Sequence, residues 1–272
     1  MYEGYVRLKL SDEELVEYYS QGYEFPDLYE NQFVMVENKE GKLLDVFWFN
    51  GVEMKAVSYK PVPGRDAAIL PRNLEQKLAF HMLQDRKTKV KVLSGGFGTG
   101  KDLLMLTHAV QELKKKKFDK IVYIRNNVEV RDTEKLGALP GSYQDKLLPY
   151  LMILADHLGG EKKLEEFISR GAIEPIHLGY LRGRDLRNSL IYCTEAQNLS
   201  VDHVQLLLGR VGEGSEIWFN GDTKAQVDRR VFKESSGMNL LIERLKGNPY
   251  FGYVHLVKSE RSPIAALADL LD

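Results

Sequence analysis

The stretch Gly95-Gly96-Phe97-Gly98-Thr99-Gly100-Lys101-Asp102 decides which fold is expected of this chain. An apolar run at residues 90–93 precedes it, and an apolar pattern with helical spacing at residues 103–110 follows it. A glycine-rich loop between a strand and a helix lets consecutive backbone N–H groups converge on one anion. The helix start adds the positive end of its dipole, and Lys101 supplies a full charge to the outer phosphates. The sequence therefore predicts a phosphate-binding loop that holds ATP through residues 96–102.

One position in this loop departs from the usual pattern. The residue after the lysine is ordinarily Ser or Thr, whose hydroxyl binds Mg²⁺, and here it is Asp102. The loop therefore predicts nucleotide binding but leaves the metal chemistry open.

Composition narrows the class of protein. The chain has 272 residues, of which 28% are charged and 43% hydrophobic, as in a globular protein with one large domain or one large and one small domain. The single Cys193 cannot form an internal disulfide, and the sequence shows no long apolar run or signal-peptide pattern. We therefore expect a cytoplasmic protein that does not enter a membrane. The formal net charge of −1 does not by itself favour nucleic-acid binding. Such binding would require a local cluster of basic residues.

Residues 1–62 predict a small β-rich module. Alternation at residues 5–10 predicts a strand, and Ser11-Asp12-Glu13-Glu14 matches a capping box that opens a short helix. Further strands are expected at residues 33–36, 43–48 and 54–59, before a proline-rich linker at 61–64. We interpret the many aromatic residues of the module as a small core, with stacking on nucleic-acid bases as the alternative.

From residue 65 to residue 272, predicted strands alternate with predicted helices. This order is typical of an α/β fold with a parallel sheet and helices on both faces, here a P-loop NTPase domain. Strands are expected at residues 90–93, 120–124, 173–177, 189–194, 216–219 and 253–257, and helices at 74–83, 103–110, 143–158, 162–169, 201–208, 240–245 and 263–271. The lysine run at 114–117 is interpreted as a solvated helix end, with nucleic-acid contact as the alternative.

Three further sequence features predict residues that act on a nucleotide bound at the loop. The apolar strand at residues 189–194 leads into Glu195, where a P-loop ATPase carries its second acidic motif. An Asp ending that strand would hold Mg²⁺, and the Glu beside it would orient the attacking water. Glu195 suits the second role, but Thr194 stands where the Asp is expected. Gln226, beyond the next strand, is predicted to sense the γ-phosphate, and Gln76, upstream of the loop, to contact adenine.

Together these residues resemble the PhoH family of P-loop ATPases, whose core is similar to the first motor domain of superfamily 1 helicases. The resemblance covers roughly residues 28–270, including the stretch at 28–33. The other matching motifs are Leu136-Gly137-Ala138-Leu139-Pro140-Gly141 with Lys146 and Pro149-Tyr150, Arg182-Gly183-Arg184, Glu195-Ala196-Gln197-Asn198, Arg210-Val211-Gly212, and Gly221-Asp222 with Gln226. The resemblance implies ATP and Mg²⁺ as cofactors, a homo-oligomeric, hexameric ring, and hydrolysis coupled to single-stranded RNA or DNA. The PIN nuclease domain of longer members is not seen in this sequence, so nuclease activity is not expected.

The departures at Asp102 and Thr194 can share one cause. In the family pattern a hydroxyl stands at the first position and an Asp at the second, and both face the same magnesium ion. Exchanging the two groups keeps one of each at the metal and leaves the local charge unchanged. An unpaired carboxylate beside phosphates would cost several kcal/mol at an effective dielectric of about 20. We hypothesise an exchanged Mg²⁺ pair; the alternatives are a degenerate site that binds nucleotide poorly or never hydrolyses it, and engineered substitutions. For the whole protein, the alternatives to an ATPase are a nucleotide-binding assembly or regulatory module with little turnover, and a small-molecule kinase.

Ring ATPases use an arginine from a neighbouring subunit to stabilise charge on the γ-phosphate. Arg184 and Arg261 are the predicted nucleotide contacts, within or across subunits, while Arg182 and Arg210 also match family positions. An ordinary salt bridge is the alternative for each of them. The predicted catalytic set comprises Lys101, Glu195, Gln226, Arg184 and Arg261, with Asp102 and Thr194 at the metal.

Overall fold

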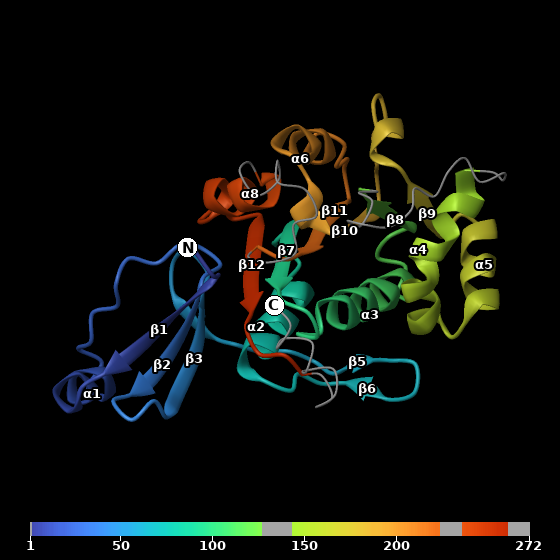
Figure 1. Ribbon diagram of the computed structural model, residues 1–272. Coiled ribbons are helices and arrows are strands. Elements are labelled where there is room, and N and C mark those ends of the chain that lie inside the picture. Colours follow the sequence, from blue (N-terminus) through green and yellow to red (C-terminus); the bar gives the residue numbers. More distant parts are fainter. Residues whose placement is uncertain (1, 127–142, 224–235, 261–272) are drawn as a thin grey trace, which may run out of the picture.

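The computed structural model describes residues 2–126, 143–223 and 236–260, and for residues 143–150 it describes the backbone alone. Its central element is a six-stranded sheet of order β12-β7-β11-β10-β8-β9, in which all neighbouring strands are parallel (Figure 1). The strands are β7 Val90–Gly95, β8 Lys120–Arg125, β9 Ile173–Ile176, β10 Ser189–Thr194, β11 Glu216–Gly221 and β12 Phe251–Leu256. The predicted α/β fold with a parallel sheet is confirmed.

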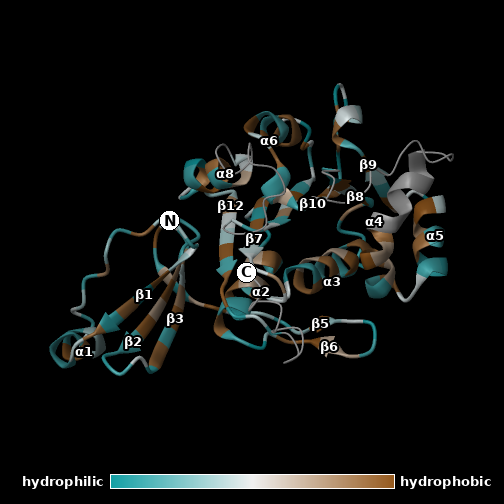
Figure 2. Ribbon diagram, viewed as in Figure 1, coloured by the Kyte–Doolittle hydropathy of each residue, from teal (hydrophilic) through white to brown (hydrophobic). Residues whose placement is uncertain are grey.

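Helices cover both faces of this sheet (Figure 1). One face carries α2 Leu74–Gln84, α3 Lys101–Lys114, α4 Tyr143–Leu158 and α5 Glu161–Ser169, and the other carries α6 Val201–Leu208 and α8 Gly237–Leu245, with short 3-10 turns η1 Leu178–Tyr180 and η2 Ala196–Asn198. α5 is amphipathic (Figure 2), and Leu164 and Phe167 are its buried residues. Within the described ranges, every helix is too short or too polar to span a lipid bilayer.

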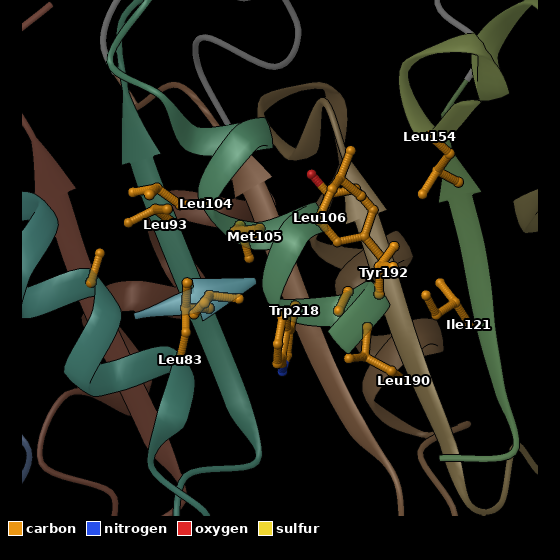
Figure 3. Close-up of a cluster of buried hydrophobic side chains, with 14 of the residues drawn as sticks. Leu83, Leu93, Leu104, Met105, Leu106, Ile121, Leu154, Leu190, Tyr192 and Trp218 are labelled. Carbon is orange, nitrogen blue, oxygen red and sulfur yellow. The ribbon is translucent and has the colours of Figure 1, made fainter. Parts of the chain in front are cut away.

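The alternation of side chains along the strands explains why two core clusters form. Leu190 and Tyr192 of β10 belong to the cluster beneath α2, α3, α4 and α5, whereas Ile191 and Cys193 belong to the cluster beneath α6 and α8. Figure 3 shows residues of the first cluster between α3 and the strands, with Tyr192 and Trp218 among them. Strands that are covered on both faces must be apolar throughout, which is the pattern of β10.

The predicted boundaries agree closely with the structure in most of the sheet. The strand at 189–194 and the helix at 201–208 have their predicted bounds, and the strand predicted at 54–59 ends earlier, at Ala56. The segment at 61–64, predicted as a linker, contains a short strand. Val62–Pro63 forms β5, which pairs with β6 Ala68–Ile69, because Val62 buries its side chain in the first core cluster. The helix predicted at 263–271 lies outside the described residues.

The N-terminal residues form a second sheet, of order β1-β2-β3-β4 (Figure 1). Its elements are β1 Tyr5–Leu10, α1 Asp12–Tyr19, β2 Phe33–Asn38, β3 Leu43–Phe49 and β4 Met54–Ala56. β1 and β2 are parallel, and the other two pairs are antiparallel hairpins. The predicted capping box is present, since Ser11 Oγ accepts from the backbone of Glu14 while the Glu14 side chain accepts from the backbone of Ser11. The small β-rich module is confirmed.

The two faces of this N-terminal sheet have different neighbours. Met35 and Trp48 belong to the core cluster that lies beneath α2, whereas Val36 packs on the opposite face with residues of α1 and the loop after it. Asn31 fastens the module to the central sheet, because its Nδ2 donates to the carbonyl of Phe251 in β12 at 3.0 Å. The module is thus packed against α2 and β12, and a domain boundary near residue 62 remains a prediction.

A buried ion cluster lies at the amino ends of β7 and β11. The carboxylate of Glu216 is almost completely buried, and four donors surround it: Lys91 at 3.1 Å, Lys89 at 3.2 Å, Lys117 at 3.1 Å and Trp218 Nε1 at 3.1 Å. Burial opposes ionisation of Glu216, but the surrounding lysines outweigh burial and lower its pKa. Burial also lowers the pKa of Lys91, to about 8. The two charges therefore depend on each other.

Replacing Glu216 by glutamine is expected to lower the free energy of unfolding by about 3–5 kcal/mol, because it leaves the buried ammonium of Lys91 without a counter-charge. Chemical unfolding followed by circular dichroism measures this loss. Glu243→Gln is the matched control, since Glu243 pairs with Lys246 at 2.8 Å nearer the surface, where an ion pair contributes at most about 1 kcal/mol. Equal losses for the two substitutions would contradict a special role of the buried cluster.

Candidate nucleotide-binding site

The predicted phosphate-binding loop runs from the end of β7 to the start of α3. Gly98 has a φ of +69°, and Gly100, the residue that caps the amino end of α3, has a φ of +91°. These left-handed conformations favour glycine, because a side chain would be strained there. The loop therefore turns directly into the end of α3 that attracts anions. The predicted order of strand, glycine-rich loop and helix is confirmed.

Lys101 is the first residue of α3, and its side chain folds back over the loop. Its Nζ donates to the carbonyl oxygens of Gly95 at 2.5 Å and of Gly96 at 2.8 Å. The ammonium group thus lies where phosphate oxygens could replace carbonyl oxygens as its acceptors. Its contact with the outer phosphates remains a prediction.

Two polar residues brace the loop from outside. Gln76 is buried; its Nε2 donates to the carbonyl of Thr99 at 3.0 Å, and its Oε1 accepts from the backbone of Arg72 at 2.9 Å. The backbone N–H of Glu260 donates to the carbonyl of Gly98 at 2.9 Å. Both ends of the Gln76 amide therefore bind backbone groups, and its contact with adenine remains a prediction.

A pocket with a volume of about 330 Å³ opens beside the loop, at the carboxyl ends of β10 and β11. Its lining brings the predicted loop residues Phe97, Gly98, Gly100, Lys101 and Asp102 together with Thr194 and Glu195, the two predicted residues at the end of β10. The order of the sheet explains this meeting. β11 separates β7 from β10, and the carboxyl ends of parallel strands lie at the same edge, where ligands bind in open α/β sheets.

Asp102 is held by two donors that were not predicted from the sequence. Its Oδ1 accepts hydrogen bonds from Tyr192 Oη at 2.9 Å and from Asn220 Nδ2 at 2.6 Å. Asn220 Nδ2 also donates to Tyr192 Oη at 2.7 Å. Burial, followed by the charge of Asp102, raises the pKa of Tyr192 well above its usual value, so the phenol remains a donor. The carboxylate is therefore stabilised through Oδ1, and neither bond uses Oδ2.

The sequence contains a weak signal for these two donors. Tyr192 shares a strand face with Thr194 because the two positions differ by two, and Asn220 lies in the next buried strand. A polar group in a buried strand needs a hydrogen-bond partner. The polar residues in these buried strands therefore indicate that hydrogen-bond partners exist, but the sequence does not identify Asp102 as the partner.

Glu195 follows β10 in a left-handed backbone conformation, with a φ of +54°. Non-glycine residues rarely adopt this conformation, and such strain clusters at functional sites. Its Oε2 accepts from Gln197 Nε2 at 2.6 Å, and Gln197 Oε1 in turn accepts from the backbone of Asp222 at 3.1 Å. A Cβ at position 221 would lie 2.7 Å from Gln197 Oε1, so Gly221 makes room for this link. Gln197 thus ties Glu195 to the end of β11.

The oxygen groups in the pocket suit magnesium. Asp102 and Thr194 contribute one carboxylate and one hydroxyl to the same lining. Mg²⁺ is usually bound by one or two carboxylates together with substrate phosphates and water, so these residues fit the ion when a nucleotide is present. In the described part of the chain, no three or more His, Cys, Asp or Glu residues gather as a metal site of their own. The exchanged pair remains a hypothesis.

Arg184, one of the two predicted arginine contacts, forms an ion pair at the edge of the sheet. Arg184 Nη1 pairs with Glu174 of β9 at 2.8 Å, and Lys120 pairs with the same carboxylate at 2.6 Å. β9 is the edge strand, separated from β7 by β8, β10 and β11, so Arg184 does not contact the loop of its own subunit. A contact across subunits remains a prediction. Gln226 and Arg261 lie outside the described residues.

The glycine-rich loop with its lysine, set in this parallel sheet beside an acidic strand end, is that of the P-loop nucleotide-binding ATPases. Within that class, residues 68–268 match the family model described as PhoH-like protein. The chain belongs to the PhoH family.

Relatives from several organisms carry the family name. Protein PhoH2 of Mycolicibacterium smegmatis is 35% identical over 199 residues, which are 72% of this chain and 45% of that protein. Protein PhoH2 of Bacillus subtilis is 32% identical over 290 residues, which are 100% of this chain and 64% of that protein. The matched region thus spans between 45% and 64% of the length of these relatives. Among solved structures, the chain matches a SWI2/SNF2 ATPase core of Sulfolobus solfataricus in complex with dsDNA. The match has 17% sequence identity and a TM-score of 0.32, and it covers 58% of this chain and 32% of that one. We draw no conclusion from a likeness of this size.

Proposed function

We propose that this chain hydrolyses ATP with Mg²⁺ and couples hydrolysis to the handling of single-stranded RNA or DNA. The observation that carries the hydrolytic part is the shared pocket in which Lys101, Asp102, Thr194 and Glu195 meet. The nucleic-acid part rests on the family resemblance to the motor domain of superfamily 1 helicases. A cytoplasmic location is also proposed, on the basis of the single Cys193.

Each of these four side chains has a role that its position supports. Lys101 would bind the outer phosphates in place of the loop carbonyls that it now binds. Glu195, oriented by Gln197, would accept the proton of the water that attacks the γ-phosphate. Mg²⁺, when bound, supplies charge neutralisation at the phosphate oxygens, and Asp102 and Thr194 are the residues that would hold it.

Replacing Glu195 by glutamine is expected to lower kcat for ATP about a hundredfold, because an amide can orient water but cannot accept its proton. Nucleotide affinity should change little, since Glu195 acts on the water and not on the phosphates. Phosphate release and equilibrium nucleotide binding measure the two effects. Glu213→Gln, an exposed change in the loop before β11, is the matched control. Wild-type turnover in Glu195→Gln would exclude Glu195 as the base.

A second candidate function is a nucleotide-binding assembly or regulatory module with little turnover. The observation that favours it is the occupation of Asp102 Oδ1 by Tyr192 and Asn220, which leaves that oxygen with fewer free lone pairs for a metal. ATP turnover measured with and without single-stranded RNA separates the candidates. Stimulation by RNA supports the first function, and binding without turnover supports the second. Turnover that requires a small acceptor molecule would instead indicate a kinase.

We also propose that a neighbouring copy completes the nucleotide site in a hexameric ring. Superfamily 1 motors close this site with a second motor domain, and the described residues contain one parallel-sheet domain. Arg184 and Arg261 are the residues proposed to reach the neighbour's γ-phosphate. Light scattering with and without nucleotide tests this model, and a strict monomer in both states would contradict it.

A further inference from the structure

The outer face of the N-terminal sheet carries a second pocket, which shares no residue with the nucleotide pocket. Its volume is about 430 Å³. The side chains that matter for its chemistry are Tyr18, Tyr19, Tyr23, Phe25, Asp45 and Phe47. Tyr23 and Phe25 meet edge to face, with ring centroids 5.2 Å apart and an angle of 86° between the planes. Tyr18 meets Phe25 in the same manner, at 6.3 Å and 76°. We call this arrangement the aromatic pocket.

A helix, a loop and a strand supply the side chains of the aromatic pocket. The carboxyl end of α1 supplies Tyr18 and Tyr19, and the loop that follows supplies the next two rings. Asp45 and Phe47 share one face of β3 because they stand two positions apart, and the buried Val36 of β2 lies in the cluster beneath them. Tyr19 is 66% exposed, so the pocket is open to solvent.

One carboxylate lines the pocket, and two more act on Tyr23 through their charge. Asp45 Oδ2 accepts from Tyr18 Oη at 2.6 Å, within the pocket lining. Burial, followed by the charges of Glu14 and Glu17, raises the pKa of Tyr23, so both carboxylates lie within electrostatic reach of its ring. Among the described residues that line the pocket, none is Lys or Arg. The local potential is therefore negative.

The net charge of the N-terminal module has the same sign as the potential in the pocket. Residues 1–62 contain twelve acidic and six basic side chains, a net charge of −6, whereas the remaining residues carry a net charge of +5. Aromatic rings can stack on nucleic-acid bases or surround a cation. A phosphate backbone binds basic surfaces, whereas residues 1–62 carry a net negative charge, so the charge of the module favours the cation.

We propose that the aromatic pocket binds a cationic side chain, in the first place arginine, of a basic polypeptide. The faces of Tyr23 and Phe25 would surround the guanidinium group, and Asp45 would lie beside it as a counter-charge. A guanidinium group is weakly hydrated and stacks on aromatic rings, which makes it a better occupant than a strongly hydrated ammonium group. This inference does not depend on the proposed ATPase activity.

Titration calorimetry of the full chain with a capped peptide of alternating glycine and arginine tests the proposal. The peptide should bind, and a peptide with norleucine in place of arginine should not. Tyr23→Leu and Asp45→Asn should each weaken binding about tenfold, because each removes one attraction to the cation. The amide of Asp45→Asn can still accept from Tyr18 Oη, so this variant keeps the fold even if Tyr23→Leu does not.

Glu40→Gln is the matched control, since it removes one negative charge from the turn between β2 and β3, outside the pocket lining. It should leave peptide affinity unchanged, and ATP turnover should be the same in all three variants. If Glu40→Gln and Asp45→Asn weakened peptide affinity equally, the binding would be a general attraction to an acidic surface. That result would overturn the proposal. Failure of the arginine peptide to bind would overturn it as well. Loss of single-stranded RNA binding in Tyr23→Leu would assign the pocket to nucleic acid instead.

Discussion

Replacing Lys101 by alanine is expected to lower ATP turnover about a thousandfold, because the change removes the full positive charge of the phosphate-binding loop. In the structure its Nζ bridges the carbonyls of Gly95 and Gly96, so it stands directly over the loop. The dipole of α3 would remain, but it supplies only partial charge. Phosphate release measures turnover, and titration with a fluorescent nucleotide measures the accompanying loss of affinity.

Lys114→Ala is the matched control for this prediction. Lys114 is the last residue of the same helix and is exposed, so its replacement removes an equal charge far from the pocket. Turnover and nucleotide affinity should not change in this variant, and unfolding curves should show that both variants are folded. Wild-type turnover in Lys101→Ala would show that the loop does not bind the reacting phosphates.

Asp102→Ser and Thr194→Asp are each expected to lower Mg²⁺-dependent turnover about a thousandfold, whereas the double substitution should restore most of it. The first change removes the carboxylate from the metal position, and the second adds another carboxylate beside it. The double substitution again leaves one hydroxyl and one carboxylate at the shared pocket lining. Turnover over a series of magnesium concentrations measures the three variants against the wild type.

The double-mutant cycle separates this exchange from a degenerate site. Two residues at one ion should show a large coupling energy, whereas independent residues have additive effects. Tyr192 and Asn220 are hydrogen-bonded to each other at 2.7 Å, so we expect each to keep this partner when Asp102 is replaced. Additive losses would reject the exchanged pair, and so would metal-independent turnover in the wild type.

The sequence by itself determined the elements that depend on neighbours in the chain. The β7 strand, the loop at 95–100 and the start of α3 were predictable because glycine spacing and apolar periodicity are local properties. The same holds for the strand at 189–194 and for the placing of Glu195 after it. Parallel strands bring their carboxyl ends to one edge, so the meeting of Lys101 with Glu195 followed from the predicted fold class.

Only the tertiary structure decided which groups bind each other across the sheet. The donors to Asp102 stand 90 and 118 positions away along the chain, in two different strands. Within its own chain Arg184 pairs with Glu174 of the edge strand, an ion pair that the sequence did not predict. Periodicity states which face of a strand a side chain occupies, but not the register or order of the strands. A hydrogen bond or ion pair depends on the distance and direction between two groups, and those are set when the whole sheet assembles.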